Sequence, residues 1–204
     1  MSLIKTRQLK MTVLCVITVC LVACNNDKVD DKFSLSDDAV ILALGDSLTY
    51  GTGAPKTESY PAILENLTGH QVINAGIPGE ISQDGLQRLP KLLEEYQPTL
   101  VILCHGANDL IRRLDTKALE QNLSNMIDLI RQSGAEVLLV SVPELKFTLN
   151  NSPVYASVAD KKSVRLEDDI IQIVESSLKS DLIHPNAQGY KLIAEEIADW
   201  IHYN

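Results

Sequence analysis

Between residues 39 and 202, short apolar runs alternate with longer segments in which apolar residues recur every three or four positions. The runs have the length and composition of strands. They lie at Ala39–Leu44, Gln71–Ala75, Thr99–Cys104, Glu136–Val142 and, more weakly, Val164–Leu166. Strands that alternate with helices predict a parallel sheet covered by helices on both faces. We therefore expect an α/β fold with one parallel sheet.

Four segments between these runs show helical spacing, and local signals mark some of their ends. Pro61–Leu67 begins with a proline, which is tolerated in a first helical turn, and stops before Gly69. Thr116–Ser133 follows Asp115, a suitable N-cap. The other two predicted helices are Ser82–Tyr96 and Ala187–His202. Pro90 would kink or restart the first of these two.

The first 23 residues have the pattern of an export signal. Three basic side chains precede the apolar run Met11–Ala23. This run has about 13 residues, whereas a membrane-spanning helix needs about 20, so a secretory signal peptide fits better than a transmembrane anchor. Leu21–Cys24 also resembles the lipobox of bacterial lipoproteins, in which the peptide is cut before a cysteine whose thiol carries lipid. The alternatives are an ordinary signal peptide with an incidental Cys24 and a retained short anchor.

These patterns predict a signal peptide (1–23), a lipidated Cys24 with a polar tether (24–38), and one domain (39–204). The net charge is −9, and loss of three positive charges with the signal gives −9 − 3 = −12. No Lys/Arg cluster follows residue 23, so a nucleic-acid-binding surface is not expected. Membrane attachment would depend on the lipid at Cys24. We expect a bacterial cell-envelope protein facing the periplasm, and Asn25 is compatible with the outer membrane.

A serine stands directly after the first predicted strand, in Gly45-Asp46-Ser47-Leu48. In open α/β sheets, ligands bind beyond the carboxyl ends of the strands, and a turn at this point would expose the Ser47 hydroxyl there. A lone serine in this position is more often a helix cap or a turn residue. The serine therefore needs a partner elsewhere in the chain before it indicates chemistry.

The best partner is His184, in Asp181-Leu182-Ile183-His184-Pro185. Across one turn, Asp181 can accept the Nδ1 hydrogen of the imidazole, which leaves Nε2 to face a serine. Pro185 restricts the backbone of His184 to extended conformations and so helps to fix the ring. Of the other histidines, we expect His70 and His202 at the surface and consider His105 a weaker rival base.

Attack on an acyl carbon creates an oxyanion that needs hydrogen-bond donors. The second predicted strand is closed by Asn74-Ala75-Gly76, where a glycine lets a backbone N–H approach a ligand. The third is followed by Gly106-Ala107-Asn108-Asp109, which offers the side-chain amide of Asn108. Seen alone, these residues also fit a turn glycine and an Asx-turn.

Together these sequence blocks resemble the SGNH (GDSL) hydrolases. The blocks, in order, are Gly45-Asp46-Ser47-Leu48, Gly76, Gly106-Ala107-Asn108-Asp109 and Asp181-Leu182-Ile183-His184. Within that superfamily, Asn74–Gly79 and Gly85–Pro90 resemble the thioesterase I/lysophospholipase L1/arylesterase branch. The resemblance covers roughly residues 39–202. The chain departs from the branch at Ala107, where many members carry Gly; the added methyl could narrow the acyl pocket without removing a donor.

The resemblance implies a three-layer α/β/α, flavodoxin-like sandwich with a five-stranded parallel sheet. It also implies Ser47 as the nucleophile, His184 as general base and then acid, and Asp181 as the residue that orients His184. The oxyanion donors would be the backbone N–H groups of Ser47 and Gly76 and the side chain of Asn108.

We therefore expect a serine esterase that hydrolyses carboxylic esters or thioesters of apolar acyl groups, small-molecule or lipid, without a metal or cofactor. One alternative is a carbohydrate or peptidoglycan O-acetylesterase, although two Phe and one Trp offer little surface for sugar stacking. Another is a non-catalytic, lipid-anchored binding module, because fold does not guarantee function. Cys104 with His105 is a weak rival nucleophile, since a thiol in an apolar strand carries little thiolate.

Overall fold

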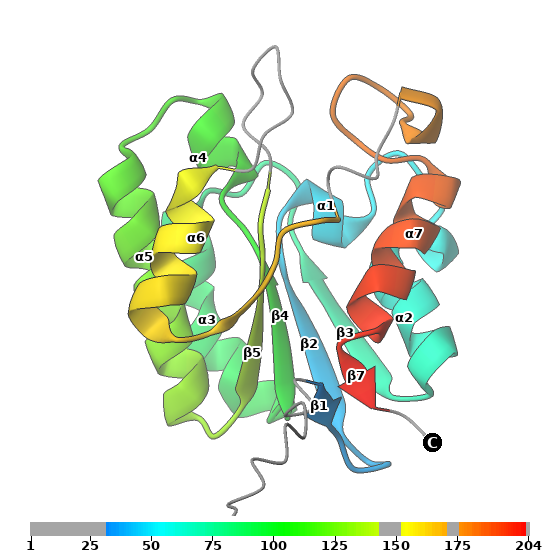
Figure 1. The fold of residues 1–204 in the computed structure, drawn as a ribbon, viewed down its shortest axis with the longest axis horizontal. Helices are drawn as coiled ribbons and strands as arrows, with labels where there is room; N and C mark the ends of the chain where they lie inside the picture. The colour runs from blue at the N-terminus through cyan, green and yellow to red at the C-terminus, as the bar shows by residue number, and fades with distance from the viewer. Residues whose placement is uncertain (1–31, 143–151, 171–175, 203–204) are drawn as a thin grey trace, which may run out of the picture. The chain divides into compact units, whose positions relative to one another are not determined.

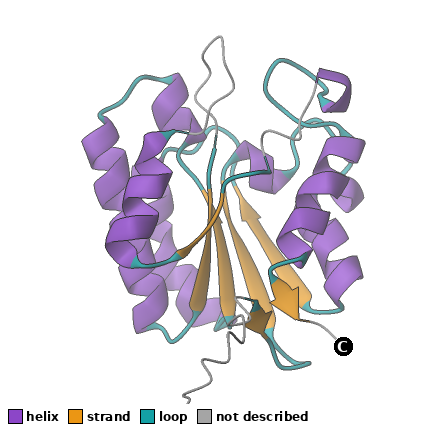
Figure 2. Cartoon of the chain, viewed as in Figure 1, coloured by secondary structure: helices purple, strands orange, loops and turns teal. Residues whose placement is uncertain are grey.

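The computed structural model describes residues 32–142, 152–170 and 176–202. Its main sheet has five parallel strands in the order β3-β2-β4-β5-β6 (Figure 2). The strands are β2 (Val40–Gly45), β3 (Gln71–Gly76), β4 (Leu100–Cys104), β5 (Glu136–Val140) and β6 (Arg165–Glu167). The prediction of a five-stranded parallel sheet is confirmed.

Helices cover both faces of this sheet. Figure 1 shows α2 and α7 on one side and α3, α5 and α6 on the other, which confirms the three-layer α/β/α architecture. The helices are α1 (Ser47–Tyr50), α2 (Tyr60–Thr68), α3 (Ser82–Tyr96), α4 (Ala107–Ile111), α5 (Thr116–Gln132), α6 (Pro153–Lys162) and α7 (Ala187–Ala198). Two short 3₁₀ turns occupy Lys56–Glu58 and Ser176–Leu178. Among the described residues, no helix is long and apolar enough to cross a membrane.

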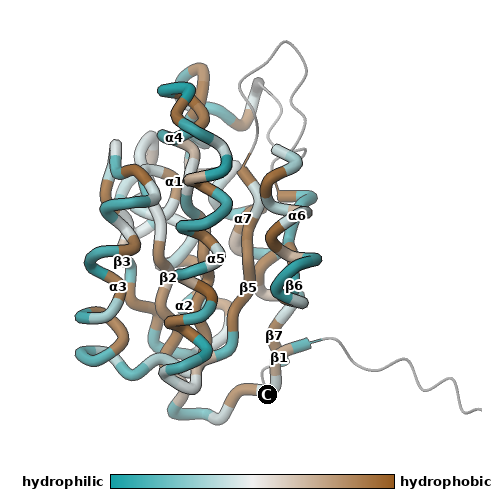
Figure 3. The backbone as a smooth tube through the Cα atoms, turned by 90° about the vertical axis from the view of Figure 1, so that its left-hand side faces the viewer, coloured by the Kyte–Doolittle hydropathy of each residue, from teal (hydrophilic) through white to brown (hydrophobic). Residues whose placement is uncertain are grey.

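The core follows the hydropathy of these elements. Every residue of β4 is buried, as a central strand covered on both faces requires. Helix α5 instead buries one stripe, including Leu119, Leu123 and Ile127. Figure 3 shows this contrast: α5 alternates between hydrophilic and hydrophobic residues, whereas β5 is hydrophobic along most of its length.

Several local features differ from the sequence-based expectations. Helix α7 ends at Ala198, and Ile201–His202 forms a short strand, β7, paired with β1 (Phe33–Ser34). The pair forms because Ile201 and Phe33 are both buried there. One helix runs through Pro90 without a restart. His70 is 5% exposed, so the prediction of a surface histidine is wrong at that position.

The strand order places a topological switch point at β2. The chain leaves β2 toward β3 at one edge, then returns past β2 to β4 on its other side. Right-handed crossovers put the connecting helices α2 and α3 on opposite faces, so the carboxyl ends of these strands stay uncovered between them. In the register of the sheet, Gly45 pairs with both Gly76 and Cys104, so the three strands end at the same level.

Candidate active site

Ser47 is the first residue of α1 and lies one residue beyond the buried N-cap Asp46. The turn from β2 into α1 is so close to β4 that a Cβ on Gly45 would lie 2.2 Å from the Cys104 carbonyl oxygen. Asp46 accepts hydrogen bonds from the Leu48 N–H at 3.3 Å and from Asn108 Nδ2 at 3.2 Å. Burial raises the pKa of the Asp46 carboxyl despite these donors. The serine is thus held on a tight strand-to-helix turn at the carboxyl end of the sheet.

The structure brings Ser47, His184 and Asp181 into one chain of contacts. His184 Nε2 lies 3.1 Å from Ser47 Oγ, and His184 Nδ1 lies 2.7 Å from Asp181 Oδ2. Because a carboxylate only accepts, Nδ1 of the neutral imidazole carries the hydrogen and Nε2 presents its lone pair to the serine hydroxyl. This is the geometry of a nucleophile, a general base and an orienting carboxylate.

Asp181 is held in place by the loop that carries the histidine. Its Oδ1 accepts the backbone N–H groups of Ile183 and His184, each at 2.8 Å. The pKa of Asp181 lies well below its usual value, because of the His184 backbone N–H, the His184 ring and the Ile183 N–H. Asp181 therefore stays ionised at neutral pH and can balance a positive charge on the imidazole.

The loop is joined to α7. The Ser180 N–H donates to the His184 carbonyl at 2.9 Å. Asn186 caps α7 by accepting the N–H groups of Gln188 and Gly189, so His184 stands two residues before the N-cap of this helix. This anchoring limits the positions that the imidazole can take.

A cavity of about 350 Å³ opens beside Ser47 and His184. Its inner wall comes from buried apolar side chains of β4, β5 and α7, namely Cys104, Val140, Ile193 and Ile197. Ala107 lines it as well. A site of this size and lining suits a small apolar group held next to the serine.

Asn108 reaches this cavity, but Gly76 does not line it. The Gly76 N–H donates to Asn74 Oδ1 at 3.0 Å, and Gly76 lines a separate depression. A Cβ on Gly76 would lie 2.1 Å from the Tyr50 nitrogen, so its lack of a side chain serves packing against α1. The structure does not bring the predicted donor Gly76 together with Ser47 and Asn108.

Gly79, which the sequence-based interpretation missed as a donor, lines the same cavity as Ser47. Its φ of +81° favours glycine, and its N–H makes no hydrogen bond to another residue of the described chain. The dipeptide Pro78-Gly79 is a turn signal that points to this position.

The rival pair does not have the geometry of a reactive thiol. Cys104 is buried, and this burial, together with the nearby Asp46 carboxylate, raises the pKa of its thiol far above the usual value. His105 is fully buried, and its Nε2 lies 3.0 Å from Glu80 Oε2.

Within the described ranges, no group of three or more His, Cys, Asp or Glu side chains is placed to hold a metal ion.

Comparison with known proteins identifies the family of this chain and several relatives. The GDSL-like Lipase/Acylhydrolase family matches residues 43–192. An arylesterase of Vibrio mimicus is 34% identical over 171 residues, which cover 78% of this chain and 86% of the relative. Thioesterase 1/protease 1/lysophospholipase L1 of Escherichia coli (strain K12) is 31% identical over 168 residues, covering 78% and 81%.

A solved structure of an esterase also matches this chain. The psychrotrophic esterase EstA from Pseudoalteromonas sp. superposes with a TM-score of 0.72 at 28% identity, covering 80% of this chain and 96% of its own. Fold, family match and relatives therefore agree with one another. The chain belongs to the GDSL-like lipase/acylhydrolase family, within the SGNH hydrolases, and is a serine hydrolase that acts on ester bonds.

Proposed function

We propose that the protein hydrolyses carboxylic esters or thioesters through an acyl-enzyme on Ser47. The observation that carries this proposal is the contact chain from Asp181 through His184 to Ser47. Ser47 Oγ attacks the acyl carbon while its proton passes to His184 Nε2. The tetrahedral intermediate expels the alcohol or thiol, which takes that proton from His184. Water then repeats the sequence on the acyl-enzyme and frees the acid.

The developing oxyanion needs donors on the side of the cavity away from His184. We assign this role to the side chain of Asn108, the N–H of Ser47 and, in place of Gly76, the N–H of Gly79. Asn108 and Gly79 line the cavity with Ser47, which supports the assignment. Loss of one such donor typically costs about 3–4 kcal/mol of transition-state stabilisation.

Ser47→Ala is expected to lower kcat for a chromogenic aryl ester by roughly 10⁴-fold or more, because the nucleophile is gone while binding remains. The measurement is initial-rate kinetics, with thermal unfolding to confirm that the variant is folded. Ser36→Ala is the matched control, since Ser36 is exposed in the turn before β2. If the Ser47→Ala variant were as active as the Ser36→Ala control, the active site would lie elsewhere.

The apolar inner wall of the cavity supports an apolar acyl group longer than acetyl as the preferred substrate. Each buried methylene contributes about 0.8 kcal/mol to binding in such a wall. An acetyl group would leave this wall uncovered, so the cavity favours the ester or thioester hypothesis over an O-acetylesterase of glycans.

We expect Val140→Phe to reduce kcat/KM for a medium-chain acyl ester by roughly 10-fold or more relative to the acetyl ester, because the larger ring fills the inner wall. Ile193→Ala should shift the preference toward longer chains. The ratio of the two substrates within one variant cancels any change in the folded fraction. A wild-type preference for acetyl, unchanged in both variants, would support the O-acetylesterase alternative.

We also propose that lipid on Cys24 holds the protein on a membrane of the bacterial cell envelope, with the domain facing the periplasm. Cys24 lies outside the described residues, and the support comes from the lipobox-like Leu21–Cys24.

Cys24→Ser is the test of this anchor. The wild-type chain should incorporate a labelled fatty acid during growth, and the variant should not, because the acceptor thiol is missing. Gel fluorography of the immunoprecipitated protein makes the measurement, and Cys104→Ser serves as the cysteine control. Equal labelling of the Cys24→Ser variant and the wild type would contradict the proposal.

A further inference from the structure

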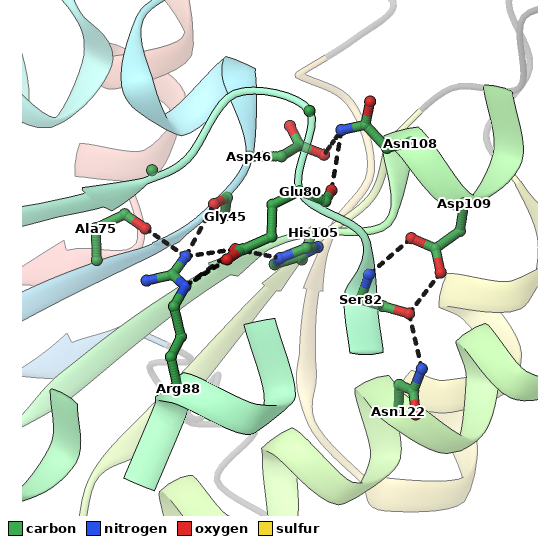
Figure 4. A network of polar contacts seen from close by, with 12 residues as sticks. Gly45, Asp46, Ala75, Glu80, Ser82, Arg88, His105, Asn108, Asp109 and Asn122 are labelled. Atoms are coloured by element: carbon green, nitrogen blue, oxygen red, sulfur yellow. Dashed lines mark hydrogen bonds and ion pairs between the residues drawn. The ribbon is translucent and has the colours of Figure 1, made fainter. Parts of the chain in front are cut away.

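A buried ionic cluster lies between α3 and the ends of β2, β3 and β4 (Figure 4). Glu80 is 8% exposed, and its carboxylate accepts Arg88 Nε at 2.8 and 3.0 Å and Arg88 Nη2 at 2.6 Å. It also accepts His105 Nε2 at 3.0 Å. Burial alone would raise the pKa of Glu80, but the hydrogen bonds from His105 and Arg88 outweigh it and lower that pKa.

Arg88 connects this cluster to the strand ends that carry the site. Its Nη2 donates to the Ala75 carbonyl at 2.8 Å and to the Gly45 carbonyl at 3.3 Å. Gly45 and Ala75 directly precede the Asp46-Ser47 turn and the end of β3. The guanidinium thus ties the Glu80 carboxylate to the backbone carbonyls at the ends of β2 and β3.

The backbone of Glu80 contacts the proposed oxyanion donor. Asn108 Nδ2 donates to the Glu80 carbonyl oxygen at 3.0 Å and, over a longer contact of 3.2 Å, to Asp46 Oδ2. An amide nitrogen has two hydrogens, so the Glu80 carbonyl fixes the rotation of the amide. The second hydrogen, now on the longer contact, can exchange onto a substrate oxyanion. Glu80 also directly follows Gly79, another of the three proposed donors.

The far end of the same loop is tied down separately. Asp109 accepts the Ser82 N–H at 2.8 Å and the Ser82 hydroxyl at 2.6 Å, and Asn122 Nδ2 donates to Ser82 Oγ at 2.9 Å. Figure 4 shows the two sets of contacts on either side of the loop. The segment 79–82 is therefore held through its Glu80 and Ser82 side chains, and both anchors are close to Asn108 in space or sequence.

From these contacts we infer that Glu80, clamped by Arg88 and His105, is a positioning residue for the oxyanion donors. The inference rests on the proposed function, since it assumes that Asn108 and Gly79 stabilise an oxyanion. The cluster fixes the Glu80 backbone, which orients the Asn108 amide and the Gly79 N–H before substrate arrives. Preorganised donors of this kind act on the transition state and not on ground-state binding.

Glu80→Gln tests this role, because the amide keeps the size of the side chain but can no longer accept Arg88 and His105 as a charged pair. The variant should lose 10- to 100-fold in kcat per active site, which is the loss expected when an oxyanion donor is misplaced. KM should be nearly unchanged. Its affinity for a trifluoromethyl ketone, which forms an oxyanion on the serine, should fall by a similar factor. Active sites are counted by fluorophosphonate titration, so partial unfolding of a variant does not change its kcat per active site.

Two further variants make the test specific. A Cβ on Gly85 would lie 2.4 Å from His105 Nε2, so Gly85→Ala should displace the histidine without changing a charge and give the same signature. Asp128→Asn is the control, since it removes the ion pair with Lys162 at 2.7 Å, between α5 and α6 and away from this loop. It should leave kcat and ketone affinity unchanged.

Asn108→Ala separates the inference from the proposal on which it rests. If Glu80 acts through Asn108, Glu80→Gln should add little to the loss already present in Asn108→Ala. Full activity of Asn108→Ala would contradict the proposed oxyanion site itself. A strong loss in Asn108→Ala, combined with normal per-site kcat and ketone affinity in Glu80→Gln and Gly85→Ala, would overturn the positioning role alone and leave a merely structural cluster.

Discussion

The contact on which the rest of the account depends is the one between Ser47 Oγ and His184 Nε2, 3.1 Å apart and 137 residues apart in sequence. Neither residue is reactive by itself, since a serine hydroxyl needs a base and a histidine needs an orienting partner. The parallel sheet creates the contact by ending β2, β3 and β4 at one level. The loop before α7 then places the His184 imidazole beside Ser47, at the carboxyl ends of these strands.

Rigidity around this contact comes from two kinds of interaction. The apolar core fixes the strands, and β4 in particular has no exposed residue. Polar groups then fix the loops that leave the strands, through Glu80, Arg88 and His105 on one side and Asp181 on the other. Buried charges are costly unless they are paired and hydrogen-bonded. The buried Glu80 carboxylate is paired with Arg88, and this pair lies next to the loop that carries Gly79.

The sequence was sufficient for the features that depend on local patterns. Strand runs, helix caps and the order of the motifs predicted the sheet, and the structure brings Ser47, Asp181 and His184 together. The spacing of three between Asp181 and His184 already implied their contact. The strand, helix-cap and Asp181–His184 signals are each encoded within one turn or one strand, whereas the pairing of Ser47 with His184 was predicted from the resemblance to the SGNH hydrolases.

Features that depend on the path of a loop or on distant partners were missed. Gly76 closes a strand, but only the course of the chain through Pro78 decides that Gly79 lines the cavity. The two-residue strand β1 pairs with β7, where Phe33 lies in register with Ile201 from the other end of the domain sequence. Arg88 is 43 residues from the Gly45 carbonyl that it binds, and no local pattern indicates that contact.

The most direct test is to find which side chain a serine-reactive probe modifies. The full-length protein is treated with a fluorophosphonate, digested, and mapped by tandem mass spectrometry, and the account predicts one adduct on Ser47. Asp181→Asn should slow the formation of that adduct, because the imidazole loses its orienting carboxylate. An adduct on a different residue, or a folded protein that forms none, would contradict the account, and the second outcome would favour a lipid-anchored binding module.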